Sequence, residues 1–408
     1  MPEPRQRTLL ALGFPESKAV QIDDILTDLA GAAVAVDAER VLDPDCVKQL
    51  SALGIGAVRL EPADGGLGFS LPALFELLAL IAHADSNLTQ ILRAHFIATE
   101  EFLRDSNRGA DVPWLREIAC GAVFGNATTE LGSHQAGTVN TRITSRADGK
   151  YSISGTKFYA TGSAYADWIQ VLAADENGSH YNVTVDRFDG GVAIDNDWDG
   201  FGQRATVSGS ARFDGAVVEE HQLCRIDADS DPFTDTVAQL VHLSTMVGIG
   251  ARLLDDVTEQ VRSRERHYSH ASETTAAGDA QVQEIIGRGI AAVSVSKSSV
   301  RSAAEATQDY LDAHRVSRSD STQLAERAHH LTNHAQVVIA PLLLALAGDV
   351  FEVGGASLLS SRMGLDRHWR NLRTLASHNP ATFKARVLGE SALLGTSLPS
   401  VWYSGRRE

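Results

Sequence analysis

The spacing of the apolar residues changes twice along this chain of 408 residues and divides it into three parts. Residues 1–120 carry apolar side chains at helical spacing, residues 121–228 alternate with a period of two, and residues 229–408 return to helical spacing. This order has no strand–helix–strand alternation, so a dinucleotide-binding Rossmann sheet is not expected. We expect an α+β protein with an N-terminal helical domain, a central antiparallel β-domain and a C-terminal four-helix bundle.

The central part carries the strand signals. Asp148-Gly149 and Asn177-Gly178 are typical of hairpin turns, and Ala205–Phe213 alternates strictly between polar residues and small or apolar ones. The strands that we expect are 138–145, 150–154, 168–173, 181–185, 205–213 and 216–218.

The flanking parts predict helices. A helical stretch over 17–50 is interrupted near Asp43-Pro44, and Ser70 is a candidate N-cap after a glycine-rich loop. Another helix is expected over 87–103. The helices expected in the bundle are 233–264, 279–313, 320–351 and 381–394.

The charge and the cysteines limit the partners and the compartment. The formal charge of -16 argues against a nucleic-acid or anionic-membrane surface, which would need a basic patch. The three cysteines show neither metal-ligand spacing nor a disulfide framework, which indicates a reducing compartment. The first residues lack the apolar core of a signal peptide, and the longest apolar run, 337–347, is too short to span a bilayer. We therefore expect a cytoplasmic protein.

A polar stretch at the start of the β-domain is the first candidate for a ligand site. It covers 124–134 and includes Asn126, Thr128, Thr129 and Ser133. Its hydroxyl and backbone groups could hydrogen-bond the pyrimidine edge and ribityl chain of a flavin. The alternative is a polar loop at a domain junction.

Two further stretches could lie beside a flat ring. Thr161, within 155–163, is either a ring-facing hydroxyl or an ordinary strand-end hydroxyl. Trp198 opens a loop with Gly200 and Gly202, where glycines allow close backbone approach and an indole can cover a ring system. The alternative for this loop is a surface segment that feeds an edge strand.

Two histidines are candidates for proton transfer. His95 lies among apolar residues of an expected helix, where a lone histidine is usually a core residue. His378 precedes Asn379-Pro380 and could simply cap a helix end.

Two runs of sequence resemble a known family. The segments Trp198–Ser210 and Asp366-Arg-His-Trp-Arg-Asn-Leu-Arg-Thr374 are similar to the acyl-CoA dehydrogenase superfamily, and closest to its flavin-dependent monooxygenase branch. The resemblance runs from about Leu53 to Ser404 and implies the α–β–α architecture of that superfamily. It also implies a homotetramer.

The resemblance assigns roles to the candidate residues. It implies that the 124–134 stretch binds the flavin, that Thr161 lies near flavin N5, and that His95 and His378 act as acid and base. Arg266 matches an arginine that contacts flavin phosphate, often across a subunit boundary. Tyr268-Ser269 stands where the dehydrogenases have Phe-Gly, which favours FMN over FAD.

The resulting hypothesis is a two-component monooxygenase. Reduced FMN from a separate flavin reductase, together with O2, would oxygenate sulfur, or equally nitrogen, in a small organic molecule. An FAD-dependent acyl-CoA dehydrogenase is the alternative, but Asn379 and Leu240 occupy the positions of its two possible base carboxylates. A flavin-holding scaffold without turnover is the third possibility.

Overall fold

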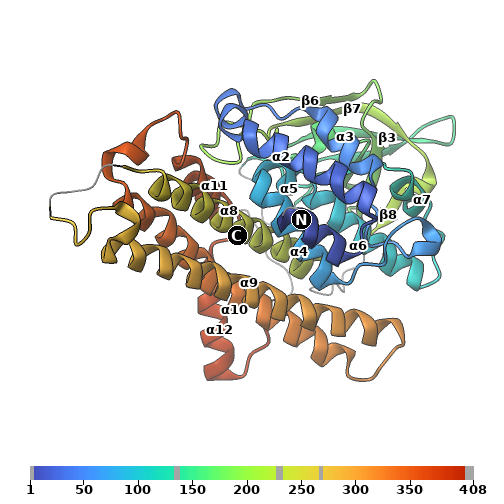
Figure 1. The fold of residues 1–408 in the computed structure, drawn as a ribbon. Helices are drawn as coiled ribbons and strands as arrows, with labels where there is room; N and C mark the ends of the chain where they lie inside the picture. Colours follow the sequence, from blue (N-terminus) through green and yellow to red (C-terminus); the bar gives the residue numbers. More distant parts are fainter. Residues whose placement is uncertain (1–3, 133–137, 227–232, 266–269, 400–408) are drawn as a thin grey trace.

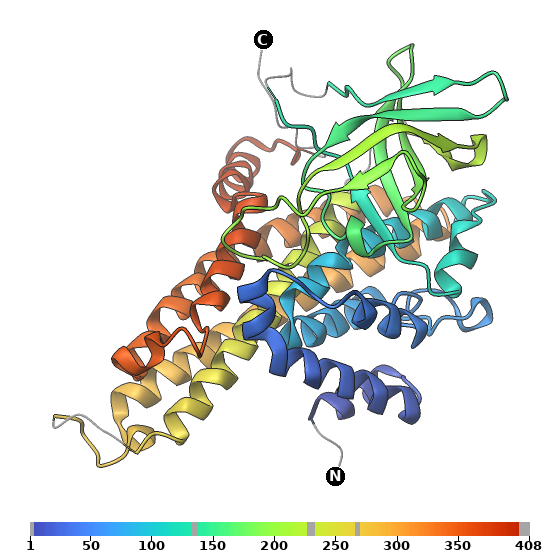
Figure 2. The ribbon, with the colours of Figure 1, turned by 90° about the horizontal axis from the view of Figure 1, so that it is seen from above.

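The computed structural model describes residues 4–132, 138–226, 233–265 and 270–399. The N-terminal helices lie between the β-domain and the long helices of the bundle (Figures 1 and 2). This arrangement follows from two contacts: α4 (Leu71–Ala84) packs on α8 (Phe233–Arg262), and α6 (Arg93–Asn107) packs on both α8 and β1 (Phe124–Ala127). The fold is therefore the mixed helical and sheet architecture that the sequence predicts.

The N-terminal helices begin where the sequence predicts caps. The Asp43 carboxylate accepts a hydrogen bond from the amide of Asp45, and the Ser70 hydroxyl accepts one from Ala73. The helix expected over 87–103 is instead two helices, which meet at Leu92. The remaining helices of this part are α1 (Pro4–Leu12), α2 (Glu16–Glu39), α3 (Pro44–Ala52), α5 (Ser86–Ile91) and α7 (Trp114–Ala119).

One sheet forms the β-domain, in the order β6-β7-β3-β2-β4-β5-β8, with β1 beside β4. Most pairs are antiparallel, as expected, but β1 and β2 both run parallel to β4. The purely antiparallel prediction was wrong here because the chain between β1 and β4 contains a complete hairpin and returns in the same direction. The other strands are β2 (Arg142–Ser145), β3 (Tyr151–Lys157), β4 (Trp168–Ala174), β5 (His180–Asp186), β6 (Val192–Ile194), β7 (Ala211–Val218) and β8 (Leu223–Arg225).

The strand predicted over 205–213 was wrong in its first half, because β7 begins only at Ala211. Residues 205–210 form a buried irregular segment in which Val207 takes a positive φ of 49°. Their carbonyls accept hydrogen bonds from a neighbouring turn: Thr206 O from Gly162 N at 3.2 Å, and Gly209 O from Ala160 N at 3.1 Å. In this segment, hydrogen bonds to that turn take the place of the hydrogen bonds between neighbouring strands that the prediction implied.

The bundle contains the four helices that the sequence predicts. A further helix, α11 (Asp366–His378), packs beside α8 and α10. By length and composition α8 and the 321–353 segment could each cross a membrane, but 83% of the apolar window of α8 is buried in the fold, as in a core helix. The other three bundle helices are α9 (Ala280–Arg315), α10 (Ser321–Asp349) and α12 (Ala381–Leu394).

Candidate active site

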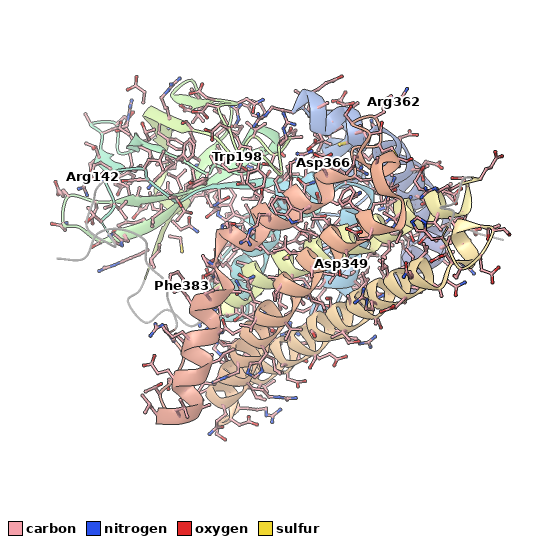
Figure 3. All side chains as sticks on the ribbon, turned by 90° about the vertical axis from the view of Figure 1, so that its left-hand side faces the viewer. Arg142, Trp198, Asp349, Arg362, Asp366 and Phe383 are labelled. Atoms are coloured by element: carbon pink, nitrogen blue, oxygen red, sulfur yellow. The ribbon has the colours of Figure 1, made fainter. Side chains whose placement is uncertain are left out.

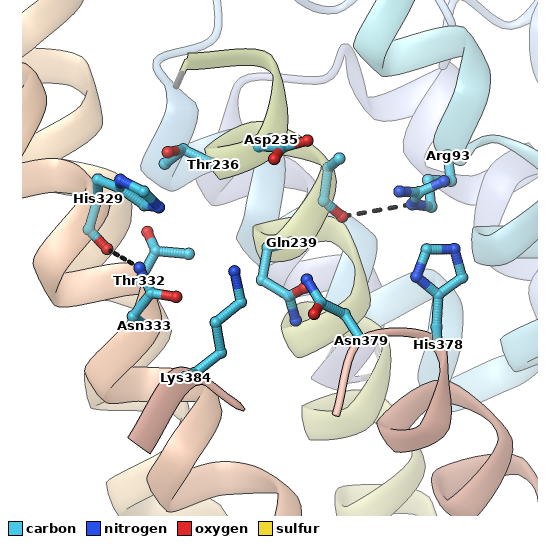
Figure 4. A pocket seen from close by; sticks show the side chains of 11 residues that line it. Arg93, Asp235, Thr236, Gln239, His329, Thr332, Asn333, His378, Asn379 and Lys384 are labelled. Atoms are coloured by element: carbon cyan, nitrogen blue, oxygen red, sulfur yellow. Dashed lines mark hydrogen bonds between the residues drawn. The ribbon is translucent and has the colours of Figure 1, made fainter. Parts of the chain in front are cut away.

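A pocket opens where five helices meet: α6, α8, α10, the end of α11, and α12 (Figure 4). Its volume is about 410 Å³ including the open mouth. Figure 4 shows Arg93 and His378 on one side, α10 on the other and Lys384 between them. Of its eleven lining residues only Ala238 has a purely apolar side chain. The pocket therefore suits a polar ligand.

Two imidazole rings meet at one side of this pocket. The centroids of His378 and of His242, on α8, are 4.5 Å apart. His378 lines the pocket, whereas His242 is buried and neither of its ring nitrogens has a partner among the described residues. Desolvation by the surrounding helices and the positive charge of Arg93 lower the pKa of His378 to about 3, although part of the His378 side chain is exposed to solvent. Both rings are therefore neutral near pH 7.

Two cations and one carboxylate dominate the charge of the pocket. Burial lowers the pKa of Lys384 to about 8 and that of Arg93 to about 10, while the nearby carboxylate of Asp235 opposes both shifts. Burial raises the pKa of Asp235, and the two cations oppose that shift. No local pattern in the sequence indicated these three residues, because they come from three helices that are far apart along the chain.

A chain of hydroxyls runs through the β-domain turn. Thr161 Oγ1 is 2.8 Å from Ser208 Oγ, which is 2.6 Å from Thr206 Oγ1. Thr206 donates to the backbone oxygen of Gln203 at 2.9 Å, so Ser208 must donate to Thr206 and Thr161 to Ser208. Within the described residues, the other acceptor of Thr161 is Tyr159 O, at 3.5 Å. Thr161 Oγ1 consequently keeps its lone pairs for an outside donor.

The stretch that was expected to bind flavin is held against the end of β3. Lys157, with an exposed fraction of 1%, donates to Thr128 O at 3.2 Å and to Glu130 Oε1 at 2.7 Å. Phe158 N donates to Thr129 O at 2.8 Å, so this stretch and the Thr161 turn lie together. Asn126 O accepts from the hydroxyl of Ser163, also in that turn, at 3.0 Å.

Glu130 links the stretch that was expected to bind flavin to Asn140 and Thr141. Its carboxylate accepts hydrogen bonds from the amides of Asn140 and Thr141 and from the Thr141 hydroxyl. These bonds and the Lys157 ammonium overcome burial and lower the pKa of Glu130 to about 2. Glu130 is therefore a fixed anion that positions the loop.

Trp198 stands at the edge of the β-domain that faces α11 (Figure 3). Its ring lies 6.0 Å, centroid to centroid, from that of Tyr159, which is 46% exposed. Arg40 Nη2 donates to the backbone oxygens of Trp198 at 2.7 Å and Gly200 at 3.0 Å. A Cβ on Gly200 would lie 1.9 Å from the indole, so only glycine permits this packing.

The same loop is tied to α11. Arg370 Nη1 donates to Phe201 O at 2.7 Å, and Asn371 Oδ1 accepts from Gln203 N at 2.7 Å. His378 ends the same helix two turns further on. The Asp366–Thr374 motif therefore positions both the Trp198 loop and the pocket histidine.

The hydroxyl chain and the pocket are neighbours. Gly162 approaches Ile91 so closely that a Cβ would lie 2.4 Å from the Ile91 oxygen. Arg93, which lines the pocket, follows two residues later. The turn that carries Thr161 therefore contacts the chain two residues before Arg93.

His95 occupies a different environment from His378. It is fully buried, its Nε2 donates to Gly56 O at 2.9 Å, and its Nδ1 accepts from Phe124 N at 3.3 Å. Burial lowers its pKa to about 4. Both nitrogens are thus engaged with backbone groups that join α6 to β1 and to the 54–57 segment, and His95 does not line the pocket. Ser133 and Arg266 lie outside the described residues.

The two positions at which a dehydrogenase could carry its base carboxylate differ in exposure. Leu240 is fully buried and does not line the pocket. Asn379 does line it, and its backbone oxygen accepts a hydrogen bond from Gln336. Asp235, five residues before Leu240, is a pocket carboxylate that the sequence did not suggest.

Comparisons with known proteins agree with this architecture. The family model for the acyl-CoA dehydrogenase C-terminal domain matches residues 240–383. The structure of FMN-bound TdsC from Paenibacillus sp. A11-2 superposes with a TM-score of 0.83 at 26% identity, covering 94% of this chain and 100% of that one. The chain has the fold of the acyl-CoA dehydrogenase superfamily.

The curated proteins that match more than four fifths of this chain are monooxygenases, whereas two acyl-CoA dehydrogenases match about half of it. The chain is 27% identical over 352 residues to a probable FMNH2-dependent monooxygenase, SfnC, of Pseudomonas putida, covering 83% of this chain and 85% of that protein. It is 26% identical over 365 residues to a dibenzothiophene monooxygenase of Rhodococcus erythropolis, covering 85% and 86%. The resemblance to the monooxygenase branch of the acyl-CoA dehydrogenase superfamily is confirmed.

Proposed function

We propose that this protein is a flavin-dependent monooxygenase that uses reduced FMN and O2 to oxygenate a sulfur atom of a small organic substrate. The observation that carries the proposal is the hydroxyl chain ending at Thr161, next to a pocket lined by His378. The FMNH2-dependent and dibenzothiophene monooxygenases among the similar proteins support both the cofactor and the sulfur chemistry.

The residues around the Thr161 turn fit FMN. Asn126, Thr128 and Thr129 would hold the flavin edge, and Trp198 with the exposed Tyr159 would cover the ring. Ser133 remains a candidate for the pyrimidine edge and ribityl chain of the flavin, and Arg266 for its phosphate. When bound, reduced FMN supplies the electrons that activate O2.

The direction of the hydroxyl chain favours the reduced cofactor. Thr161 donates its proton to Ser208 and so presents an acceptor, which matches the N–H that a flavin carries at N5 only after reduction. Oxidised flavin has an acceptor at N5. That nitrogen would face the lone pairs of Thr161 Oγ1 and could not form a hydrogen bond with them. The hydrogen-bond direction along these hydroxyls therefore favours reduced over oxidised flavin.

His378 is the residue to which we assign proton handling. Its neutral ring lines the pocket and can accept or donate a proton at a ring nitrogen. His95 has both nitrogens engaged with the backbone, so we give it a packing role in place of the acid/base role that the resemblance implies.

An FAD-dependent acyl-CoA dehydrogenase fits the pocket less well. Such an enzyme needs a carboxylate base, and the two positions that would supply it carry Leu240 and Asn379. Asp235 lies near the cations Arg93 and Lys384, whose charges favour its ionised form. We regard it as a charge partner of those cations.

The proposal also covers the oligomeric state of the protein and its source of reduced flavin. We propose a homotetramer in the cytoplasm, fed by a separate flavin reductase. Large apolar side chains on the outer faces of the bundle helices support self-association, and Phe383 (53% exposed) is visible in Figure 3. The others are Ile290, Val295, Val338, Leu393 and Leu394.

An anaerobic titration with FMN and FAD, each oxidised and reduced, tests the cofactor assignment. We expect reduced FMN to bind at least tenfold more tightly than oxidised FMN and more tightly than either form of FAD. Tight binding of oxidised FAD, followed by its reduction on addition of an acyl-CoA, would instead establish the dehydrogenase.

A further inference from the structure

Backbone strain concentrates around the hydroxyl chain. A positive φ costs free energy in any residue other than glycine and persists only where neighbours hold it, which is common at functional sites. Of five such residues in the described part of the chain, one, Ser317, lies apart in the turn between α9 and α10. The other four lie in or beside the Thr161 turn, segment 205–210 and the Trp198 loop; they are Arg40, Tyr159, Gln203 and Val207.

Gln203 is the residue at which the hydroxyl chain ends. Its φ is 50°, it is 3% exposed, and its main-chain oxygen accepts a hydrogen bond from the Thr206 hydroxyl at 2.9 Å. Because a carbonyl oxygen can only accept, this contact fixes the Thr206 proton and, through Ser208, the proton of Thr161. If φ changed to the negative region while the amide stayed in place, the carbonyl would turn away from Thr206. The proton order along the chain thus depends on the backbone conformation of one residue.

Two helices hold Gln203 in this conformation. Its amide donates to Asn371 Oδ1 on α11 at 2.7 Å, and its side-chain Nε2 donates to Ser86 Oγ, at the start of α5, at 3.0 Å. Asn371 Nδ2 also donates to Ser86 Oγ, at 3.1 Å, so the three residues form a closed ring of hydrogen bonds. All three are buried, where the low dielectric strengthens such bonds. The ring therefore offsets the cost of the positive φ.

We propose that Gln203 is a positioning residue for the flavin site: its positive φ directs its main-chain oxygen at Thr206, and the resulting proton order makes Thr161 an acceptor for the N5 proton of reduced FMN. Gln203 acts through Thr206 and Ser208, because its own hydrogen bonds do not reach Thr161. The inference rests on the proposed function, which names reduced FMN as the cofactor. A tenfold preference for reduced FMN corresponds to a rise of about 30 mV in the two-electron midpoint potential of the bound flavin.

Three substitutions at Gln203 separate its backbone from its side chain. All remove the bond to Ser86, but glycine adopts a positive φ freely, alanine less readily and valine least, because valine is β-branched. We expect Gln203→Gly to keep the ratio of the dissociation constants of oxidised and reduced FMN within about threefold of the wild type. Gln203→Val should lower this ratio by up to about tenfold, the effect of one hydrogen bond, with Gln203→Ala between them. Equal effects of all three substitutions would overturn the proposal.

Anaerobic fluorescence titration of the full-length protein with each form of FMN measures the ratio. Spectroelectrochemistry gives the midpoint potential of the bound FMN independently. This potential should fall by up to about 30 mV in Gln203→Val and stay near the wild-type value in Gln203→Gly. A lowered potential in Gln203→Gly as well would assign the effect to the lost side chain and contradict the role of the backbone.

A double variant tests the route of the effect. Thr206→Val should lower the ratio as Gln203→Val does, because it removes the hydroxyl that the Gln203 carbonyl orients. Adding Gln203→Val to Thr206→Val should then change the ratio no further, since the two residues act in one series. A further fall in the double variant would show that Gln203 acts by another route, against the assignment.

Ser317→Val is the matched control for backbone strain. Ser317 has a φ of 53° and is exposed, so valine should be strained there in the same way. The melting temperature of Ser317→Val should fall, while its flavin ratio stays that of the wild type. A fall in the ratio as large as in Gln203→Val would assign the effect to general destabilisation.

The outcomes distinguish this inference from the proposed function. The binding of both forms of FMN is measured without O2 or substrate. If the Gln203 variants leave the ratio unchanged while the wild type oxygenates an organosulfur compound, the positioning role is wrong and the oxygenase remains. If the variants follow the expected order but no substrate is oxygenated, the positioning role remains and the oxygenase is wrong.

Discussion

The imidazole of His242 packs against that of His378 with 4.5 Å between ring centroids, so one fully enclosed ring supports the ring that lines the pocket. His242 is 2% exposed and comes from the middle of α8, whereas His378 is the last residue of α11. The pair joins a core helix to the end of the helix whose earlier turns hold the Trp198 loop. The helix α11 thus connects the pocket histidine to the proposed ring-binding loop.

Replacing His378 tests its role in proton transfer. His378→Phe should lower the rate of substrate oxygenation about 100-fold, because general acid–base catalysis typically contributes 100-fold or more. Reduced FMN should still bind within about threefold of the wild type. His334→Phe, an exposed histidine on α10, is the control. Oxygenation at the wild-type rate in His378→Phe would remove His378 from the mechanism.

The pH dependence gives a separate test of the same residue. An ordinary imidazole would give an inflection near pH 6.5. Because the pKa of His378 is lowered to about 3, its ring stays neutral from pH 5 to pH 8 and should give no inflection there. Stopped-flow rates of oxygenation at saturating reduced FMN measure this. An inflection near 6.5 that disappears in His378→Phe would show that the ring is solvated.

His242 should contribute little to stability through its nitrogens. Both are buried without hydrogen-bond partners among the described residues, and replacing such a group by an apolar one of similar shape is neutral or stabilising. We therefore expect His242→Phe to keep or raise the melting temperature measured by scanning calorimetry. Leu240→Ala, in the same helix, should lower it as a core truncation does. A fall of more than about 2 °C in His242→Phe, roughly 1 kcal/mol, would indicate a hidden partner.

Ser208 should set the redox preference of the flavin site. Ser208→Ala removes the acceptor that orients the Thr161 proton, so Thr161 could then donate to oxidised flavin as well. We expect the preference for reduced over oxidised FMN to fall by up to about tenfold, the effect of one hydrogen bond of about 1.4 kcal/mol. Fluorescence titration in both redox states measures it. An unchanged ratio would contradict the direction assigned to the hydroxyl chain.

Glu130 should stabilise the fold in a pH-dependent way. Glu130→Gln leaves the buried Lys157 ammonium without its counter-charge and should cost about 3 kcal/mol. Glu219→Gln, in an exposed pair with Lys150, should change stability by less than about 1 kcal/mol. Because the pKa of Glu130 is about 2 in the folded protein and about 4.5 ordinarily, its contribution is complete above pH 4.5 and is lost as the pH falls toward 2. The stability gap between wild type and Glu130→Gln should therefore narrow over that window, and a constant gap would contradict the assignment.

Local signals in the sequence predicted much of the fold. The caps at Asp43 and Ser70 and the bundle helices depend on neighbouring residues and on helical spacing, and they were predicted. The segment 205–210 was not, because its alternation matches a strand while its carbonyls bond to the turn at Ala160–Gly162. A period of two cannot show which partner a backbone group will find.

The candidate site was predictable only where residues close in sequence build it. Thr161 and the Asn126–Thr129 segment lie together because two adjoining stretches carry them. Arg93 and Lys384 are separated by nearly 300 residues and line one pocket only because α6 packs on α8 and α12 packs on α10. His95 carried the right residue type, but its backbone partners Gly56 and Phe124 depend on tertiary packing that no local pattern encodes.

Oxygen labelling tests the central claim most directly. The protein is mixed with chemically reduced FMN and ¹⁸O2 in the presence of small organosulfur compounds, both anionic and neutral, and the products are analysed by mass spectrometry. We predict one ¹⁸O atom in the oxygenated product, formed only when protein, reduced FMN and O2 are all present. Substrates that remain unlabelled while all the reduced FMN is consumed to hydrogen peroxide would contradict the assignment.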